Sequence, residues 1–250
     1  MSRTARTAFL ALLLAAPALV LSPGAVLPAA AAQAGVAPAA SSVAKVPVAA
    51  ATPSPAAAPK APKAPTDPRN IGVLVNKQVP LKPKNYVPRG LVTVQGQRLR
   101  AEPASALKTM MKDAKRAGAT LVAVSGYRSY TTQKSLFARY SRLYGAAYAS
   151  RISARPGYSE HQTGLTMDVG AANGKCRLSS CFGSTKAGTW VAKNAWKYGY
   201  IVRYPRGQEK VTGYTYEPWH LRYVGKRIAA AMKKGKIPTL EAYYGRAKRS

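Results

Sequence analysis

The chain has 250 residues, of which 39 are Lys or Arg and 8 are Asp or Glu, giving a formal net charge of +31 at pH 7. Its 47% of hydrophobic residues and its two cysteines exclude a wholly disordered chain, a collagen-like or coiled-coil protein and a disulfide-dense scaffold. Because the chain has only eight acids and two histidines, any place where these residues gather is informative.

The N-terminal residues 1–32 have the pattern of a secretory signal peptide. Two arginines precede an apolar run at 8–21, a Pro-Gly pair ends the run, and small residues at 29–32 offer an Ala-x-Ala cleavage site. A membrane anchor is the alternative, but the run is shorter than the ~20 residues of a membrane span. We therefore expect a protein that is secreted or associated with a bacterial cell wall and that keeps no stable membrane span after cleavage.

Residues 33–66 consist almost entirely of Ala, Pro, Val, Ser and Lys, with no aromatic residue and no acid. Such a segment buries too little apolar surface to offset the entropy cost of ordering it, so it is predicted to be a flexible linker. Two interpretations stay open, a spacer that reaches into a wall and a compositionally biased segment without a specific role. Residues 67–250 are predicted to form one folded domain.

The folded part begins with a helix, a strand and a second helix. Residues 103–116 have apolar side chains at helical spacing and end before Gly118, and the β-branched run at 120–125 predicts a short strand. Thr131 is predicted to cap the second helix. The core-facing side chains of that helix are expected to be Leu136, Phe137, Tyr140, Leu143 and Tyr144.

The second half of the domain is predicted to hold short strands. A third helix is expected at 189–198, strands at 201–204 and 215–224, the latter interrupted by Pro218, and a last helix from Lys226. Helices come first and short strands later, without regular βαβ alternation. This order predicts an α+β fold, a single compact domain with a small, mostly antiparallel sheet and helices packed on it.

Both histidines stand near a carboxylate. Asp168 follows His161 by seven residues, and Glu217 precedes His220 by three. A single His or acid is more often a core residue or a charge partner, but two imidazoles and one carboxylate are a common set of ligands for catalytic zinc. A second carboxylate can then act as general base on a water. Helix breakers interrupt both segments, so the ligands are expected on strands and loops of the small sheet.

Three ordered motifs carry a family resemblance. They are Ser-Gly-Tyr-Arg-Ser-Tyr at 125–130, Ser-x-His-x-x-Gly-x-x-x-Asp at 159–168, and Glu-Pro-Trp-His-Leu-Arg-Tyr at 217–223. Together they resemble the D-alanyl-D-alanine carboxypeptidases of the VanY type, in the M15 family of zinc peptidases, and the similarity covers about residues 71–225. Thr166 stands where that family usually has Ala.

The resemblance implies a role for each motif residue. It implies one Zn²⁺ ion bound by His161, Asp168 and His220, with Glu217 as catalytic base and Arg128 as electrophilic helper. Further substrate contacts are expected from three residues. Gln133 and Ser159 are suited to hydrogen-bond a terminal amide or carboxylate, and Trp219 is suited to form a wall of the pocket.

Cys176 and Cys181 enclose a four-residue loop just after the Asp168 segment. In an exported chain a short disulfide is expected there. A cysteine-based metal site is the alternative, but the chain offers no third or fourth soft ligand.

The expected function is an exported zinc carboxypeptidase that hydrolyses the terminal D-Ala-D-Ala bond of peptidoglycan stem peptides. Rival hypotheses are an L,D-carboxypeptidase or a peptidoglycan endopeptidase on the same scaffold, and a non-catalytic basic wall-binding protein. The basic excess fits anionic wall polymers as a partner, and it also fits a merely solvated surface. Nucleic acid is not expected, because the exported chain has no nucleic-acid-binding motif.

Overall fold

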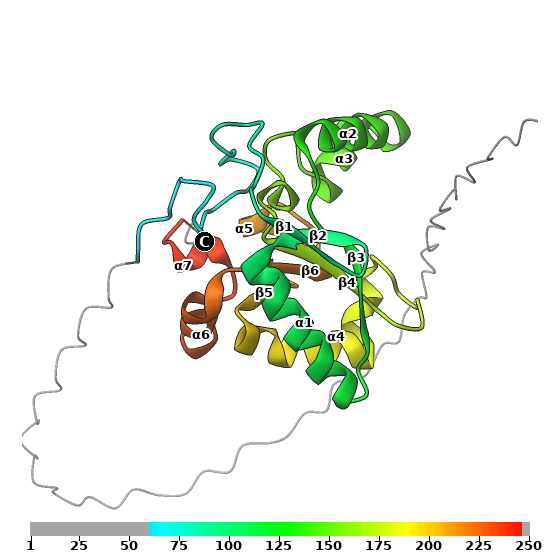
Figure 1. Cartoon of the computed structure of the whole chain (residues 1–250). Coiled ribbons are helices and arrows are strands. Elements are labelled where there is room, and N and C mark those ends of the chain that lie inside the picture. The colour runs from blue at the N-terminus through cyan, green and yellow to red at the C-terminus, as the bar shows by residue number, and fades with distance from the viewer. Residues whose placement is uncertain (1–60, 247–250) are drawn as a thin grey trace, which may run out of the picture. The chain divides into compact units, whose positions relative to one another are not determined.

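The structure is a computed structural model that describes residues 61–246 (Figure 1). The predicted signal peptide and most of the predicted linker lie outside the described residues, and both boundaries of the linker stay predictions. Ala64 is already buried in a cluster with Leu74, Val224 and Ile228. Among the described residues, none of the helices combines the length and the apolarity that a membrane crossing needs.

Sixteen short elements make up the described part of the chain. In order they are β1 Leu91–Val94, β2 Gln97–Arg100, α1 Ala101–Arg116, β3 Leu121–Ser125, α2 Tyr130–Tyr144, α3 Ala146–Ile152, η1 Glu160–Thr163, β4 Thr166–Ala171, η2 Ser180–Ser184, α4 Lys186–Asn194, η3 Ala195–Tyr198, β5 Tyr200–Tyr204, α5 Glu209–Thr212, β6 Glu217–Tyr223, α6 Gly225–Lys234 and α7 Leu240–Tyr243.

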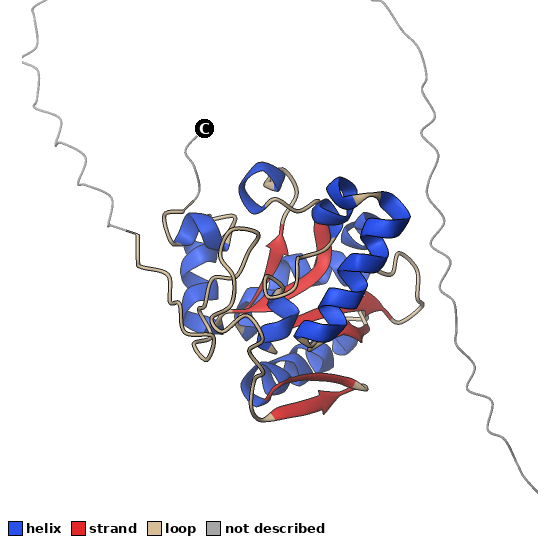
Figure 2. Ribbon diagram, turned by 90° about the horizontal axis from the view of Figure 1, so that it is seen from above, coloured by secondary structure: helices blue, strands red, loops and turns tan. Residues whose placement is uncertain are grey.

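The central sheet has the strand order β3-β4-β6-β5, and every neighbouring pair in it is antiparallel. Strands β1 and β2 form a separate hairpin, which Figure 2 shows beside the larger sheet. Asp168 of β4 is the register partner of His220 of β6, so these two side chains lie next to each other on one face. The predicted α+β class with a small antiparallel sheet and packed helices is confirmed.

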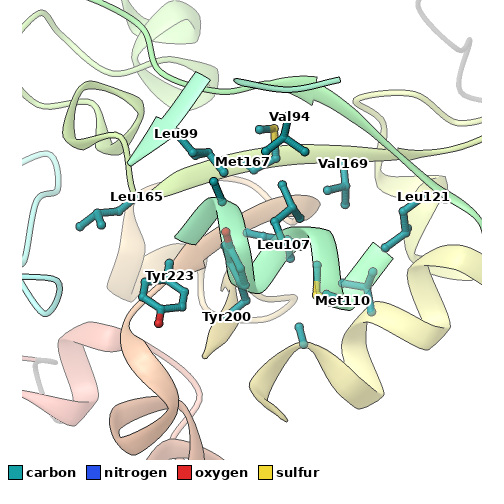
Figure 3. Packing of buried hydrophobic residues seen from close by; sticks show 14 of the residues in the cluster. Val94, Leu99, Leu107, Met110, Leu121, Leu165, Met167, Val169, Tyr200 and Tyr223 are labelled. Carbon is teal, nitrogen blue, oxygen red and sulfur yellow. The ribbon is translucent and has the colours of Figure 1, made fainter. Parts of the chain in front are cut away.

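The main core lies on the other face of this sheet. Alternate residues of β4 and β6 point into it, and α1 and the β1–β2 hairpin cover them (Figure 3). The core residues of these five elements include Val94, Leu99, Leu107, Met110, Met167, Val169, Leu221 and Tyr223. Burying side chains of this size stabilises the fold by about 1.5–3 kcal/mol each. The core therefore fixes the strands whose opposite face carries Asp168 and His220.

The first predicted helix and strand are confirmed as α1 and β3. Leu107, Met110 and Ala114 of α1 are buried, and Gly118 follows with a φ of +67°, a conformation that glycine adopts without strain. The strand Leu121–Ser125 pairs with β4. Both elements were predictable because their periodicity is strong and local.

The second predicted helix exists as α2, but two details of the prediction are wrong. Its N-cap is Ser129, whose hydroxyl accepts the Thr132 amide, and not Thr131. Its apolar face does not lie in the core, since Leu143 and Tyr144 are 58% and 49% exposed and Gln133 is its one buried residue. The reason is its place: α2 packs with α3 on the side of the sheet away from α1 and α4 (Figure 1).

The later elements need smaller corrections. The predicted helix 189–198 is α4 followed by the 3₁₀ turn η3, and the predicted strand 215–224 is β6. Pro218 does not interrupt β6, because it is the second residue of the strand and stands next to a register irregularity in the pairing with β5.

Candidate metal centre and active site

Three side chains from three elements converge at one point. His161 comes from η1, Asp168 from β4 and His220 from β6, and one ligand atom of each lies within 4.8 Å of the other two. Asp168 Oδ2 is 3.3 Å from His161 Nε2, and Asp168 Oδ1 is 3.3 Å from His220 Nδ1. All three residues are buried. The sequence therefore predicted correctly which residues gather.

The ring of His161 is fixed by the chain around it. Its Nδ1 lies 2.8 Å from the carbonyl oxygen of Gly126, and because a carbonyl only accepts, this nitrogen must donate. The lone pair is thereby left on Nε2, which faces Asp168. The short helix η1 ends at Gly164, whose φ of +68° turns the chain toward β4.

The donor set fits a metal ion. Asp168 Oδ1 is buried without a hydrogen-bond partner among the described residues, and an ion at this point would satisfy it. Two imidazoles and one carboxylate match the ligands of catalytic zinc sites.

Charges within the cluster shift the pKa values of its members. Burial raises the pKa of Asp168, but the two histidines outweigh burial and hold it well below its usual range. Burial lowers the pKa of His161. Burial also lowers the pKa of His220, yet the Asp168 and Glu160 carboxylates, whose oxygens lie 3.3 and 3.5 Å from its ring nitrogens, bring it up to about 9.

Glu217 stands at the edge of this cluster as a second carboxylate. Its Oε2 is 3.5 Å from His220 Nδ1, and the residue is 9% exposed. Burial raises the pKa of its carboxyl to about 7. A carboxyl whose pKa lies near neutrality can both accept and return a proton, as a general base requires.

Arg128 is held beside the cluster by the start of α2. Its Nη1 donates to Gln133 Oε1 at 2.8 Å, and its Nη2 donates to Ser125 Oγ at 3.0 Å. Its backbone amide donates to the His161 carbonyl at 3.2 Å. Burial lowers the pKa of the guanidinium, and the negative charge of Asp168 opposes this. A guanidinium in this position can stabilise negative charge that develops on a substrate oxygen.

The structure gives Gln133 a role that the sequence did not indicate. Its Nε2 donates to Ser153 Oγ at 3.0 Å and to the Ala154 carbonyl at 2.7 Å, while its Oε1 accepts from Arg128. Both amide hydrogens are therefore used within the protein, and the side chain orients Arg128. A direct contact of Gln133 with substrate stays a prediction.

Ser159 and Trp219 differ in their relation to the site. Ser159 is buried at the start of η1, one residue before Glu160, and its substrate contact stays a prediction. Trp219 is half-buried and packs against the main core. A place of Trp219 in the wall of a substrate pocket stays a prediction.

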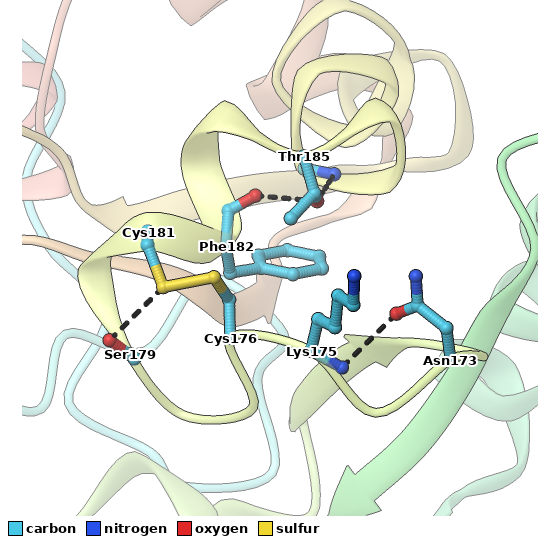
Figure 4. The surroundings of a disulfide bond; sticks show 8 residues. Asn173, Lys175, Cys176, Ser179, Cys181, Phe182 and Thr185 are labelled. Atoms are coloured by element: carbon cyan, nitrogen blue, oxygen red, sulfur yellow. Dashed lines mark hydrogen bonds between the residues drawn. A yellow bond between two sulfur atoms is a disulfide. The ribbon is translucent and has the colours of Figure 1, made fainter.

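The predicted disulfide between Cys176 and Cys181 is present, with Cα atoms 5.4 Å apart (Figure 4). Both cysteines of the chain are used in it, so the alternative of a cysteine metal site is excluded. Phe182 follows the bridge and is fully buried in the main core. The loop between β4 and α4 is thus attached to the main core.

Four buried residues behind His220 were missed by the sequence analysis: Glu160, Arg203, Arg222 and Glu241. They form ion pairs with one another, and their side chains are almost fully buried. A signal existed for Glu160, which is one of only eight acids and directly precedes His161. No local pattern marked Arg203 or Glu241, because their partners are distant in the sequence.

Comparison with known proteins identifies the family. Residues 96–226 match the VanY family, described as D-alanyl-D-alanine carboxypeptidase. YodJ of Bacillus subtilis (strain 168), a protein named as a carboxypeptidase, is 47% identical over 193 residues, which cover 73% of this chain and 70% of YodJ. A D-alanyl-D-alanine carboxypeptidase of Enterococcus faecium is 39% identical over 143 residues, which cover 57% of this chain and 42% of that protein.

Solved structures agree with this match. The LdcB LD-carboxypeptidase has a TM-score of 0.67 at 47% identity and covers 73% of this chain and 89% of its own. A variant of the D,D-pentapeptidase VanY, solved with Zn(II), has a TM-score of 0.60 at 28% identity, covering 70% of this chain and 98% of its own. Because the family match spans residues 96–226 and YodJ is matched over 70% of its length, the chain belongs to the VanY family of D-alanyl-D-alanine carboxypeptidases.

Proposed function

We propose that the chain is a zinc-dependent carboxypeptidase that removes the C-terminal D-alanine from peptidoglycan stem peptides. The observation that carries the proposal is the cluster of His161, Asp168 and His220 within 4.8 Å, with Glu217 3.5 Å from His220. The relative solved with Zn(II) supports zinc as the metal. When bound by these three residues, one zinc ion would polarise the scissile carbonyl and acidify a water.

The chain's own residues supply the remaining steps. Glu217 takes a proton from the attacking water and later hands it to the departing amine, since its pKa lies near neutrality. Arg128, oriented by Gln133, stabilises the negative charge that develops on the carbonyl oxygen of the substrate. Burial of the cluster strengthens these interactions, because charges in a dry site are screened less than in water.

Two candidate specificities follow from the relatives. Cleavage between two D-alanines is supported by the D-alanyl-D-alanine carboxypeptidase family match. Cleavage of an L,D bond is the second candidate, and it is supported by the 47% identity with the LdcB LD-carboxypeptidase and by the 40% identity with the L,D-carboxypeptidase DacB of Streptococcus pneumoniae. Both reactions release a single D-alanine from the end of a stem peptide.

We also propose that the enzyme acts outside the cytoplasm, in or near the cell wall. Support comes from the signal-peptide pattern at residues 1–32 and from the disulfide, which is typical of exported proteins. Anionic wall polymers are proposed as partners because the net charge is +31.

The zinc-loaded protein should be incubated with defined muropeptides and the products identified by mass spectrometry. Loss of D-alanine from a pentapeptide supports the D,D assignment, loss from a tetrapeptide supports the L,D assignment, and separation of a cross-linked dimer supports an endopeptidase. Stoichiometric zinc without any hydrolysis would favour a non-catalytic wall-binding protein.

The Glu217→Gln variant tests the mechanism. It keeps the shape of the side chain but removes the base, so we expect turnover to fall by about 10²–10⁴-fold. Zinc content, measured by elemental analysis, should stay at one ion per chain, because Glu217 is not among the three ligands. Wild-type turnover in this variant would show that the mechanism is wrong.

A further inference from the structure

We propose that Glu160 is the residue that positions His220 for metal binding. The inference rests on the metal centre of the proposed function and adds a residue that does not itself touch the ion. Glu160 and His161 are neighbours in η1, yet the Glu160 side chain is directed to the other histidine, His220. His161 is a member of the cluster, while the Glu160 carboxylate faces the far side of the His220 ring.

The carboxylate of Glu160 is held so that only one oxygen is free. Its Oε1 accepts from Arg203 Nε at 2.8 Å and from Arg222 Nη1 at 2.6 Å. Its Oε2 is buried, has no hydrogen-bond partner among the described residues, and lies 3.5 Å from His220 Nε2. His220 Nε2 is likewise buried and without another partner in the described part of the chain. Two orphaned polar atoms of opposite character thus face each other.

The opposite edge of the His220 ring belongs to the metal cluster. Nδ1 lies 3.3 Å from Asp168 Oδ1 and 3.5 Å from Glu217 Oε2. The ring of Tyr204 packs against the imidazole in a tilted arrangement, with the two ring centroids 4.7 Å apart. A proton on Nε2, facing the Glu160 carboxylate, leaves the lone pair on Nδ1, where a metal ion would bind.

The two arginines that hold Glu160 are themselves fixed. Arg203 donates to both oxygens of Glu241, at 2.8 and 2.7 Å, and Arg222 donates to the Val73 carbonyl at 2.6 Å. Two guanidiniums therefore face two carboxylates in a fully buried network. The fixed positions of its two arginine partners keep the free oxygen of Glu160 aimed at His220.

This arrangement predicts an effect on metal affinity that can be separated from general damage to the fold. Glu160→Gln and Glu241→Gln each remove one negative charge from Arg203 at nearly constant volume, but only the first alters the contact with His220. Zinc dissociation constants should be measured by competition with a chelating dye, for variants whose circular dichroism matches the wild type. We expect about 10–100-fold weaker binding for Glu160→Gln and less than about threefold for Glu241→Gln.

Wild-type affinity in Glu160→Gln would overturn the proposal, and so would an equal loss in both variants, because that would trace the effect to the ion-pair network.

If Glu160→Gln does not fold, ¹⁵N-histidine spectra of the zinc-loaded wild type provide the test. The chain has two histidines, so the spectrum is simple to assign. We expect a protected His220 Nε2–H signal, and rapid exchange of this proton with solvent would contradict the inference. Neither readout uses a peptide substrate, so a wrong substrate assignment would leave the result intact.

Discussion

Glu217 illustrates how the residues around one carboxyl set its chemistry. Burial is the main cause that raises its pKa, and the negative charge of Asp168 adds to the rise. The positive charges of His220, Arg128 and Lys77 act in the opposite direction, and the result is a pKa of about 7. A bound zinc ion would add positive charge and bring the value lower. With a pKa of about 7, the carboxyl is partly ionised at neutral pH and still basic enough to accept a proton.

Removal of one of these positive charges should move the pH profile in a known direction. Lys77 lies with its ammonium 4.3 Å from the ring centre of Tyr214, and its charge lowers the pKa of Glu217. In Lys77→Met the pKa of Glu217 rises, so a higher pH is needed to ionise the base. We expect the acid limb of kcat/KM to move to higher pH by roughly half a pH unit.

The matched control for this experiment is Lys108→Met, which removes an exposed lysine from α1, the helix on the core side of the sheet. Its pH profile should coincide with that of the wild type. A shift of the Lys77→Met limb to lower pH, or equal shifts in both variants, would contradict the assignment of this limb to Glu217.

At the scale of elements, β4 is the strand on which the site depends, and it is buried over its whole length. Its core face carries Met167 and Val169, and its other face carries Asp168 and Thr166. The hydroxyl of Thr166 is buried without a hydrogen-bond partner among the described residues. An unpaired buried hydroxyl costs about 1–3 kcal/mol, so this position weakens the strand that presents Asp168.

Thr166→Val should therefore stabilise the protein. Valine keeps the branched shape of threonine and removes the unpaired hydroxyl, and we expect the free energy of unfolding to rise by about 1 kcal/mol. Urea unfolding of the metal-free protein measures this change. The control is Thr163→Val, since the Thr163 hydroxyl donates to the Glu160 carbonyl at 2.6 Å and accepts the Leu165 amide at 3.0 Å. The control should be less stable than the wild type, and a destabilised Thr166→Val would show that its hydroxyl has a partner.

Helices and strands that show a clear local sequence pattern were predicted well, whereas features that depend on contacts between distant residues were not. The periodicity of α1 and the β-branched run of β3 identify them without any tertiary information. For α2 the same periodicity predicted an apolar face but could not say what covers it, and Leu143 and Tyr144 are exposed. The hairpin β1–β2 was missed because its strands have four residues each and its turn is Gln-Gly rather than Asn-Gly.

The candidate site shows the same division. His161, Asp168 and His220 could be named because histidines and acids are scarce and the motifs resemble a family. Glu160 could not be given a partner, since its contacts with Arg203 and Arg222 span 43 and 62 residues and arise only when the sheet forms. Packing, rather than local pattern, decides which residues support a metal ligand.

At the scale of the whole molecule, the scarce acids are unevenly distributed. Four of the eight acids are buried, namely Glu160, Asp168, Glu217 and Glu241. In the described part of the chain the other four acids are not buried, and every basic side chain except Arg203 and Arg222 is likewise at least partly exposed. The exposed surface is therefore more basic than the net charge alone indicates, and it presents a positive field to anionic polymers.

This field predicts binding to a polyanion that does not depend on catalysis. We expect inorganic polyphosphate, used as the probe, to bind the chain at low ionic strength and to bind about tenfold more weakly at 0.5 M salt, since salt screens exposed charges. Fluorescence anisotropy of a labelled polyphosphate measures this, with neutral dextran of similar length as the control polymer. Glu217→Gln should bind as the wild type does, because Glu217 is buried in the site and contributes little to the outer surface. Equal binding of dextran, or binding that does not change with salt, would show that the basic surface does not recognise anionic polymers.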